Sequence, residues 1–379
     1  MRSWLGKNTV FVFGAGATRA CGGPLTADIL PNAYGSKTRP RMQLDGLAEE
    51  LEECLVRHFH VPADSSSRER QDYPPLPLVL SLLDLAIEQD RPLYFRDGER
   101  SSTDLWSRER LAQARKAIEY VIFTVLDEHL RTISDNWYER LFDLVCLMQT
   151  EPTAISLNYD MLLDNVLFKM AAKHGGGGAR VTYCCDIQTD AYRARRVEYG
   201  QLMKLHGSLN WLYCGCCRRL DIGMSECGKQ AVTCSTLDEL FTQNSLDEHY
   251  MSRPRACPEC STPMRAVMIT PTRAKDYRNP HIQSIWYQAE RALRRAEHVC
   301  FIGYSLPDDD LEVIDLLRRG LGNLNPNRIT VVEHDEKHAA IADHAVGRRY
   351  RSLFGSTIEW HTGGFQGWLQ EVQQLVNGV

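Results

Sequence analysis

Two pairs of cysteines form the most specific chemical pattern in the sequence. They are Cys214 with Cys217 and Cys257 with Cys260. Two residues separate the thiols of each pair, and two such turns can surround Zn²⁺ with four sulfurs. All four positions would be filled by protein, so we expect a structural zinc ion without metal-bound water. The ligand set stays open, because Cys216 could compete with Cys217. Cys227 or Cys234 could also replace a ligand, and reduced cysteines without metal are the alternative.

His206 is the second residue that could do chemistry. It follows an apolar run in LMKLHG (202–207), eight residues before the first cysteine of the zinc pattern. An imidazole with an ordinary pKa of about 6.5 can exchange a proton near neutral pH. A single histidine at a strand end is usually a hydrogen-bonded structural group, so a catalytic role requires other polar groups beside it.

A turn containing glycines, GAGAT (14–18), closes the first apolar run and begins a helical pattern. Gly14 and Gly16 would let the backbone approach a pyrophosphate, and N–H groups at the helix start would bind its charge. The turn departs from the dinucleotide pattern GxGxxG, because Arg19 takes the place of the third glycine. An ordinary strand–helix turn is therefore the alternative.

The elements that must position these groups are strand-like runs, each followed by a helix-like segment. The runs are TVFVFGAG (9–16), TAISLNYD (153–160), HVCFIGYS (298–305), RITVVEHD (328–335) and STIEWHT (356–362). They are apolar and β-branched without alternation, which is typical of parallel strands covered on both faces. These repeated βα units predict an α/β fold with a Rossmann-like, doubly wound parallel sheet.

Two segments interrupt the predicted sheet. Residues 35–150 contain amphipathic stretches with apolar residues every three or four positions, which predict a helical insertion. Residues 213–262 are rich in cysteine and poor in periodicity, which predicts a small zinc-binding lobe. The Rossmann-like domain would then comprise residues 1–34, 151–212 and 263–379.

The predicted sheet would bring the polar candidates together. Ligands of open α/β sheets bind at the carboxyl ends of the strands. TAISLNYD places Asn158 and Asp160 at that edge, and GYSLPDDD places Gly303 and Ser305 there. We therefore expect an amide, a carboxylate, a hydroxyl, the glycine turn and His206 to meet in one cleft.

Composition excludes several classes of protein. The chain has 379 residues, and its 44 Lys and Arg against 49 Asp and Glu give a net charge of −5, so direct nucleic-acid binding is not expected. Thirteen cysteines, some of them adjacent, favour a reducing compartment and a metal site over a disulfide framework. The N-terminal apolar run suits a buried strand better than a signal peptide, and no run approaches the roughly 18 apolar residues of a membrane helix. We expect a cytoplasmic protein without membrane association.

Five motifs occur in the order found in the sirtuin family. They are GAGAT with GGP (14–24), SLNYD (156–160), KLHG (204–207), the paired CxxC turns and GYSLPDDD (303–310). The sequence resembles that family over its whole length except the helical insertion. It is most similar to the sirtuin-like proteins of bacterial antiphage defence. The resemblance implies a sirtuin-like fold, NAD as the substrate and a structural zinc ion.

The resemblance also assigns roles, motif by motif, to eleven residues. The NAD-binding set is Gly14, Ala15, Gly16, Thr18, Pro24, Asn158, Asp160, Gly303, Ser305 and Glu333. In the family, the glycine motif lines the phosphates, Asn-x-Asp grips the nicotinamide ribose and orients water, and Gly-x-Ser contacts the adenosine half. Thr18 stands where the family usually has serine, and Glu333 would bind the adenosine ribose. The implied catalytic residues are His206, Asn158 and Asp160.

Two departures from deacylating sirtuins indicate a different activity. PLTAD (24–28) replaces an aromatic–arginine pair, and VMITPTRAKDY (267–277) replaces a Phe-Gly-Glu segment that binds peptide. The residues that open the nicotinamide–ribose bond are nevertheless present. We therefore expect an NAD⁺ hydrolase that yields nicotinamide and ADP-ribose. An NAD-dependent protein deacylase or ADP-ribosyltransferase, and a non-catalytic assembly subunit that binds NAD or ADP-ribose, are the alternatives.

The defence relatives imply partners and regulation. They suggest an effector that acts by NAD depletion, a homo-oligomer, and a partner such as a HerA-type ATPase translocase or another phage sensor. The chain has no GxxxxGK[ST] motif, so ATPase activity would belong to the partner. The helical insertion is a candidate assembly surface, and a lid or a core extension is the equal alternative.

Overall fold

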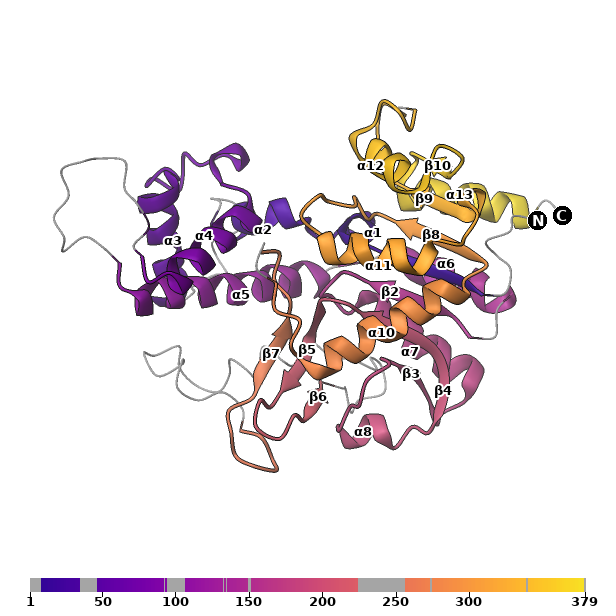
Figure 1. Ribbon diagram of the computed structural model, residues 1–379, viewed down its shortest axis with the longest axis horizontal. Helices are drawn as coiled ribbons and strands as arrows, with labels where there is room; N and C mark the ends of the chain where they lie inside the picture. The colour runs from indigo at the N-terminus through magenta and orange to yellow at the C-terminus, as the bar shows by residue number, and fades with distance from the viewer. Residues whose placement is uncertain are drawn as a thin grey trace.

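A seven-stranded sheet, parallel throughout, forms the centre of the protein in the computed structural model (Figure 1). The structure describes residues 8–34, 46–91, 93, 106–131, 133, 135–148, 151–223, 256–272, 275–338 and 340–377. The strands are β1 (Thr9–Phe13), β2 (Thr153–Ser156), β3 (Ala179–Thr182), β4 (Val197–Lys204), β8 (His298–Ile302), β9 (Ile329–Val332) and β10 (Glu359–His361). Their order in the sheet is β10-β9-β8-β1-β2-β4-β3.

β1 occupies the middle of the sheet because all five of its residues, TVFVF, can be buried. It pairs with β2 on one side and β8 on the other, so that Phe11 lies beside both Ala154 and Cys300. β8 and β9 are also buried along their whole length. The prediction of parallel strands covered on both faces is confirmed.

Helices cover both faces of the sheet. α10 (Pro280–Arg295) and α11 (Leu311–Leu321) pack together in front of it in Figure 1. The helices α1 (Ala15–Ala20), α6 (Trp137–Met148), α7 (Leu162–Gly175) and α13 (Gly364–Asn377) contact one another in a second layer. The remaining connections contain α8 (Asp190–Arg193), η6 (Pro326–Arg328) and α12 (Ala345–Phe354).

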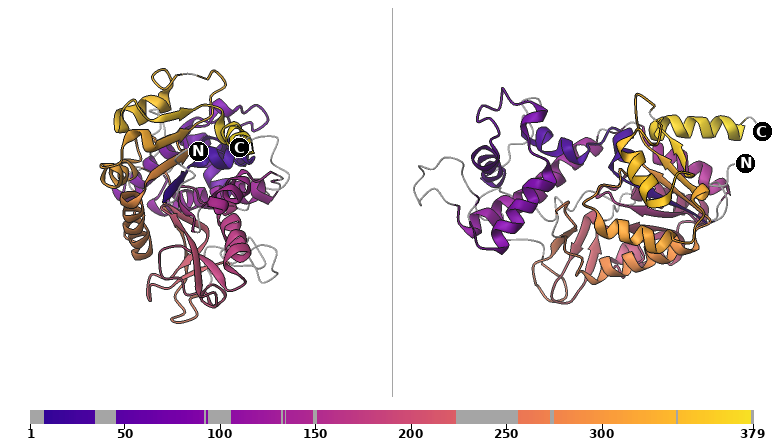
Figure 2. Two further views of the ribbon diagram at one scale, coloured as in Figure 1. Left: turned by 90° about the vertical axis from the view of Figure 1, so that its right-hand side faces the viewer. Right: turned by 45° about the horizontal axis from the view of Figure 1, so that its top comes forward.

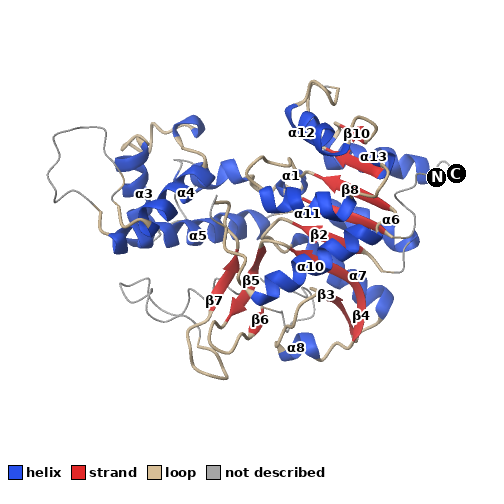
Figure 3. Cartoon of the chain, viewed as in Figure 1, coloured by secondary structure: helices blue, strands red, loops and turns tan. Residues whose placement is uncertain are grey.

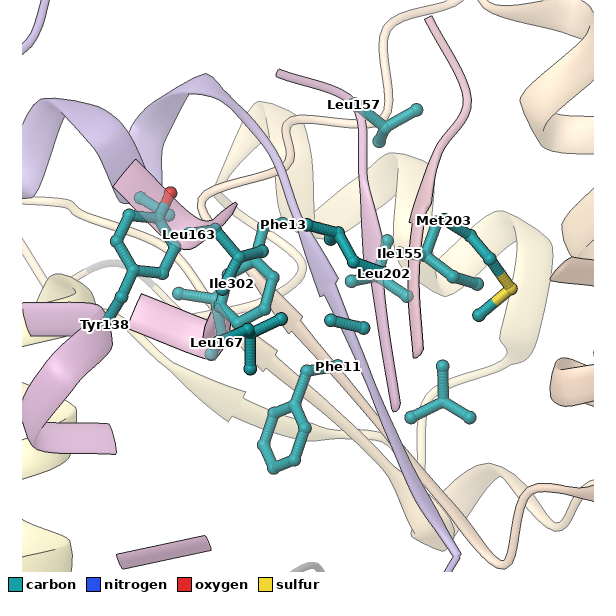
Figure 4. Close-up of a cluster of buried hydrophobic side chains, with 14 of the residues drawn as sticks. Phe11, Phe13, Tyr138, Ile155, Leu157, Leu163, Leu167, Leu202, Met203 and Ile302 are labelled. Atoms are coloured by element: carbon teal, nitrogen blue, oxygen red, sulfur yellow. The ribbon is translucent and has the colours of Figure 1, made fainter. Parts of the chain in front are cut away.

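α6 belongs to the main core. Phe13 of β1 lies against Tyr138 of α6, with ring centroids 5.1 Å apart (Figure 4). The ring centroids of Phe11 and Phe142 lie 5.8 Å apart. The sequence predicts an insertion up to residue 150, whereas α6 packs in the core of the sheet. An amphipathic helix has the same periodicity whichever core it faces, so periodicity alone could not assign α6.

The helical insertion forms a second core beside the sheet (Figure 2). Its elements are η2 (Thr26–Asp28), α2 (Ile29–Tyr34), α3 (Gly46–Phe59), η3 (Arg70–Asp72), α4 (Leu76–Glu88) and α5 (Arg108–Arg131). α3 and α4 pack along α5, and this core buries residues such as Leu51, Leu80 and Ile118. α2 joins this core as well, although the sequence analysis placed residues up to 34 in the Rossmann-like domain.

The cysteine lobe contains a small antiparallel sheet of order β6-β5-β7 (Figure 3). Its strands are β5 (Gly207–Tyr213), β6 (Leu220–Ile222) and β7 (Arg265–Met268). The lobe therefore extends beyond the predicted residues 213–262 on both sides. Cys227 and Cys234 lie outside the residues that the structure describes.

The sheet order places a ligand site beside β1. The chain adds β2, β4 and β3 on one side of β1, and later adds β8, β9 and β10 on the other. Such a reversal opens a crevice at the carboxyl ends of the strands. The predicted fold class, a doubly wound parallel sheet with a helical insertion and a cysteine lobe, is confirmed. Among the described helices, none combines the length and apolarity required to cross a membrane.

Candidate active site

A cavity of about 430 Å³ opens at the carboxyl edge of the sheet, beside β1. Small-molecule sites have volumes of roughly 300–1,000 Å³. All eleven residues assigned to NAD binding or catalysis from the sequence line it: Gly14, Ala15, Gly16, Thr18, Pro24, Asn158, Asp160, His206, Gly303, Ser305 and Glu333. These residues follow strands that are far apart in the chain, and the sheet topology brings them together.

The helical insertion supplies a further part of the wall, which the sequence did not predict. Leu76 and Pro77 of α4 line the cavity, together with Ile122 and Leu126 of α5. The insertion therefore adds apolar surface to a cavity whose strand-end residues are largely polar. Desolvation by such surface strengthens electrostatic interactions inside a site.

Backbone contact between the glycine turn and the end of β8 shapes the cavity. A Cβ atom on Gly14 would lie 2.6 Å from the carbonyl oxygen of Gly303, and one on Gly16 would lie 2.8 Å from the Gly303 Cα. Gly303 itself has a φ of +61°, which favours glycine. The N–H of Gly16 donates to the Gly303 carbonyl at 2.8 Å, so this N–H is already occupied and is not free for a phosphate.

A hydrogen-bond network joins the glycine turn to the end of β2. Nδ2 of Asn158 donates to the carbonyl oxygen of Gly14 at 2.9 Å and to Oγ1 of Thr18 at 3.0 Å. Thr18 donates to Oδ2 of Asp160 at 2.7 Å, and the Tyr138 hydroxyl lies 3.1 Å from Thr18 Oγ1. The described hydrogen bonds of the Asn158 side chain use Nδ2, which leaves Oδ1 to accept from a water or hydroxyl group.

Asp160 is held as a buried carboxylate. Burial raises its pKa, whereas the Lys204 ammonium and the bond from Thr18 favour the ionised form. The backbone N–H of Leu162 donates to Oδ1 at 3.0 Å, so both carboxylate oxygens accept hydrogen bonds. A carboxylate at this position can stabilise positive charge that develops in the cavity.

His206 lines the cavity and carries an acceptor nitrogen without a partner among the described residues. Its Nδ1 lies 3.2 Å from the carbonyl oxygen of Leu157, and since a carbonyl only accepts, this contact places the proton of the neutral ring on Nδ1. Nε2 is buried and has no hydrogen-bond partner among the described residues. Burial lowers the pKa of His206, against the Asp310 carboxylate, which raises it. The ring is therefore neutral near pH 7 and can accept a proton at Nε2.

An ion pair between Lys275 and Asp310 also lines the cavity. Only 3% of the Lys275 side chain and 12% of the Asp310 side chain are exposed. The hydroxyl of Tyr304 donates to the other oxygen of Asp310 at 3.0 Å. Because the two charges act on the pKa of His206 in opposite directions, they partly offset each other there.

Glu333 follows β9, lines the cavity and carries a second buried acceptor without a partner among the described residues. Its Oε1 accepts from the backbone N–H of His334 at 3.1 Å, while its Oε2 is buried without a partner among the described residues. Burial raises the pKa of Glu333. A buried acceptor without a partner is suited to the hydroxyl group of a ligand. Ser305, which follows β8, contributes to the same wall.

The four predicted zinc ligands converge in the cysteine lobe. The Sγ atoms of Cys214, Cys217, Cys257 and Cys260 lie within 4.8 Å of one another. Four sulfurs at about 2.3 Å from one Zn²⁺ would be about 3.8 Å apart, so the cluster fits a structural zinc site. Cys216 is exposed and is not part of this group.

The sequence does not single out several residues of the site. Tyr138 lies in WYERLFDLVCLM, where its spacing indicates only a buried helix face. Asp310 is the third acid of GYSLPDDD, and this acidic run was a signal that could have been followed. Lys275 lies in the segment that replaces the Phe-Gly-Glu motif, and no pattern marks it.

The sequence matches no protein-family model and no curated protein. Solved structures with a similar chain course include a Sir2 homologue in complex with NAD, at 12% identity and a TM-score of 0.43, covering 98% of this chain and 89% of that one. A Sir2 protein bound to a propionylated peptide has 12% identity and a TM-score of 0.41, covering 97% and 93%. A mutant Sir2 homologue in complex with 2′-O-acetyl ADP-ribose has 13% identity and a TM-score of 0.39, covering 98% and 92%. Similarities this distant assign no activity to the chain.

Proposed function

We propose that this protein is an NAD⁺ hydrolase that cleaves the nicotinamide–ribose bond to give nicotinamide and ADP-ribose. The observation that carries the proposal is the Nε2 atom of His206, a buried acceptor without a partner in the wall of a cavity that Asn158 and Asp160 also line. The motif order shared with sirtuins supports NAD as the ligand. A protein that only binds NAD needs no base at this position.

The reaction adds water across one bond. The water oxygen bonds to the anomeric carbon of the ribose, and the electron pair of the breaking C–N bond leaves with neutral nicotinamide, so no acid is required. The Asp160 carboxylate stabilises the positive charge that develops on the ribose. Oδ1 of Asn158 positions the water, and Nε2 of His206 accepts its proton or that of a ribose hydroxyl. General-base catalysis of this kind contributes about 10²–10⁴-fold.

Hydrolysis is favoured over acyl transfer by the segments that replace the peptide-binding motifs. PLTAD forms η2 at the start of the insertion, where Asp28 pairs with Arg70 at 2.7 Å and Arg19 at 3.4 Å. Leu25 and Thr26 line the cavity in place of an aromatic–arginine pair. These residues anchor the insertion and carry no group that recognises an acyl-lysine.

The test is nicotinamide release by the purified protein. His206→Ala and Asn158→Ala should each abolish NAD⁺ loss while the fold and the zinc content stay intact. His174→Ala is the matched control, because this histidine is exposed on α7 away from the cavity. Unchanged turnover in His206→Ala would remove the proposal. NAD⁺ consumption only with an acylated peptide or another acceptor would favour a deacylase or transferase. Thermal stabilisation by NAD without turnover would favour a binding subunit.

We further propose that the enzyme acts as an antiphage effector through NAD depletion, as a homo-oligomer with a HerA-type translocase or another phage sensor as partner. The motif resemblance to sirtuin-like defence proteins supports this role. Cells that carry the gene should lose NAD after phage infection, and cells with His206→Ala should not. Co-purification and mass photometry of the complex would measure the stoichiometry, and a protein that stays monomeric and without a partner during infection would contradict the assembly.

A further inference from the structure

A buried ion pair lies directly beneath the catalytic segment and takes no part in the proposed chemistry. Nζ of Lys204, the last residue of β4, lies 2.9 Å from Oδ2 of Asp164 on α7, with side chains 0% and 1% exposed. The hydroxyl of Tyr183 donates to the other oxygen of Asp164 at 2.6 Å. The two charges and their partners are therefore enclosed by the protein.

The ammonium is also bonded to the backbone of the catalytic segment. Its Nζ donates to the carbonyl oxygen of Asp160 at 2.5 Å and to that of Tyr159 at 3.4 Å. An ammonium has three donors, and Asp164 and these two carbonyls account for all three. Lys204 thus holds the backbone immediately after Asn158, while His206 lies two residues further along the same chain.

Stability alone does not explain this arrangement. Apolar side chains of similar volume usually replace a buried ion pair without loss of stability, because desolvation of two charges offsets their attraction. An apolar pair could not bond the carbonyls of Tyr159 and Asp160, which lie at a bend where the chain leaves β2. The Tyr159 carbonyl also accepts from the backbone N–H of Leu209 at 3.0 Å, so what the lysine adds is a fixed position for the Asp160 carbonyl relative to β4.

We infer that Lys204, held by Asp164, is a positioning residue that sets the distance between the Asn158–Asp160 segment and His206. This inference rests on the proposed function and deepens it. Two neighbouring residues bond to the segment: Lys204, at the end of β4, donates to the carbonyls of Tyr159 and Asp160. His206, just after β4, donates from Nδ1 to the carbonyl of Leu157. Together they align the base with the amide and carboxylate that act on the same sugar.

Lys204 has a second effect, on the charge of Asp160. The groups that face Asp160 come from three helices and one strand. They are Thr18 of α1 and Cys21 at its end, Tyr138 of α6, Asp164 of α7 and Lys204 of β4. Burial raises the pKa of Asp160, and the Lys204 ammonium is the largest influence that lowers it. Removal of the ammonium should therefore raise that pKa further, so that the carboxylate becomes protonated at a higher pH.

The experiment compares two variants that differ only in the ammonium. Asp164→Asn keeps Lys204 and an acceptor for the Tyr183 hydroxyl. The double variant Lys204→Met with Asp164→Asn removes both charges without leaving an isolated one. Lys173→Met is the control on the same helix, because it breaks an exposed pair with Asp143 at 3.2 Å.

We expect the double variant to fold and to lose roughly 10²-fold in kcat, the effect of a misplacement of about 1 Å, with little change in KM for NAD⁺. Asp164→Asn should lose much less in kcat, because Lys204 keeps its bonds to the carbonyls, although the unpaired ammonium lowers its stability. Lys173→Met should lose nothing. The acid limb of kcat should move to higher pH in the double variant. Hydrogen exchange of the backbone amides of residues 157–162 should accelerate, while exchange in β8 stays unchanged.

Three results would overturn the inference. The first is a folded double variant with the kcat, pH profile and hydrogen exchange of Asp164→Asn. The second is loss of the fold in the double variant while Asp164→Asn folds, which would make Lys204 purely structural. The third is equal acceleration of hydrogen exchange throughout the sheet. A wild-type protein without nicotinamide release would instead remove the proposed function, and the hydrogen-exchange comparison would still decide the role of Lys204.

Discussion

The contact between the glycine turn and β8 gives the sharpest test of how the fold shapes the cavity. An ideal Cβ on Gly303 would lie 2.2 Å from the backbone nitrogen of Ala17, whereas ordinary contact begins at 3.4 Å. The two backbones would have to separate by about 1.2 Å, the difference between these distances. Gly355 is a matched control, because its φ is +89° but nothing lies within 4 Å of its Cβ position. Both Gly→Ala substitutions impose backbone strain of about 1–3 kcal/mol.

Gly303→Ala adds an overpacking cost of about 1–3 kcal/mol that Gly355→Ala does not have. In chemical denaturation, Gly303→Ala should therefore lose roughly twice as much free energy of unfolding as Gly355→Ala, because it bears both backbone strain and overpacking. Nicotinamide release should fall by about 10²-fold in Gly303→Ala, since a shift of this size misplaces the groups around the ribose. Gly355→Ala should keep its activity. Equal stability losses, with wild-type turnover in both variants, would refute the reasoning from backbone contact.

Three further predictions concern single groups. Nicotinamide release should fall as the pH drops through the lowered pKa of His206, because the protonated ring cannot accept a proton. A pH–rate profile whose acid midpoint lies above the ordinary histidine pKa of about 6.5 would contradict this. Tyr138→Phe should lower kcat several-fold and lower the free energy of unfolding by about 1 kcal/mol, because Thr18 loses a hydrogen-bond partner. Calorimetry and a kinetic assay would measure both effects, and unchanged stability and kcat would show that this hydrogen bond does not support the site. Cys257→Ser should release zinc and lower the melting temperature, whereas Cys216→Ser should change neither. Equal zinc content in the two variants, measured by mass spectrometry, would contradict a zinc site at the four-cysteine cluster.

Most of the sheet could be predicted because its strands are buried on both faces. β1, β8 and β9 are buried along their whole length, and such strands appear in the sequence as continuous apolar runs. Two strands were not among the predicted runs: β3, an edge strand with only alternate residues buried, and β4, which begins with two exposed residues. The boundaries of the insertion were misplaced for a different reason. A helix shows its apolar face in the sequence but not which core that face contacts.

The candidate site was predictable where chemistry depends on residue type and spacing, as with the two CxxC pairs, the glycine turn and Asn158. It was not predictable where a residue acts through its surroundings. Lysine is rarely buried, so the sequence favours a solvent-exposed Lys204, and Tyr138 is indistinguishable from other aromatic core residues. Tyr138 lies 120 residues from Thr18 and Lys204 lies 40 residues from Asp164, and only the folded chain brings these partners together.

Hydrogen bonds connect the insertion to the segment that contacts His206, the proposed catalytic base. Arg115 of α5 donates to Oγ1 of Thr270 at 2.6 Å. Ile269, the residue before Thr270, forms backbone hydrogen bonds with two residues that line the cavity. The Tyr159 hydroxyl donates to the Ile269 carbonyl at 2.5 Å, and the Ile269 N–H donates to the carbonyl of His206 at 2.8 Å. A displacement of α5 therefore changes the apolar wall of the cavity and, through two residues of backbone, the position of the imidazole. A partner that displaced α5 would therefore reach the proposed catalytic histidine without a relay across the sheet, because α5 and His206 are bonded to the same short segment.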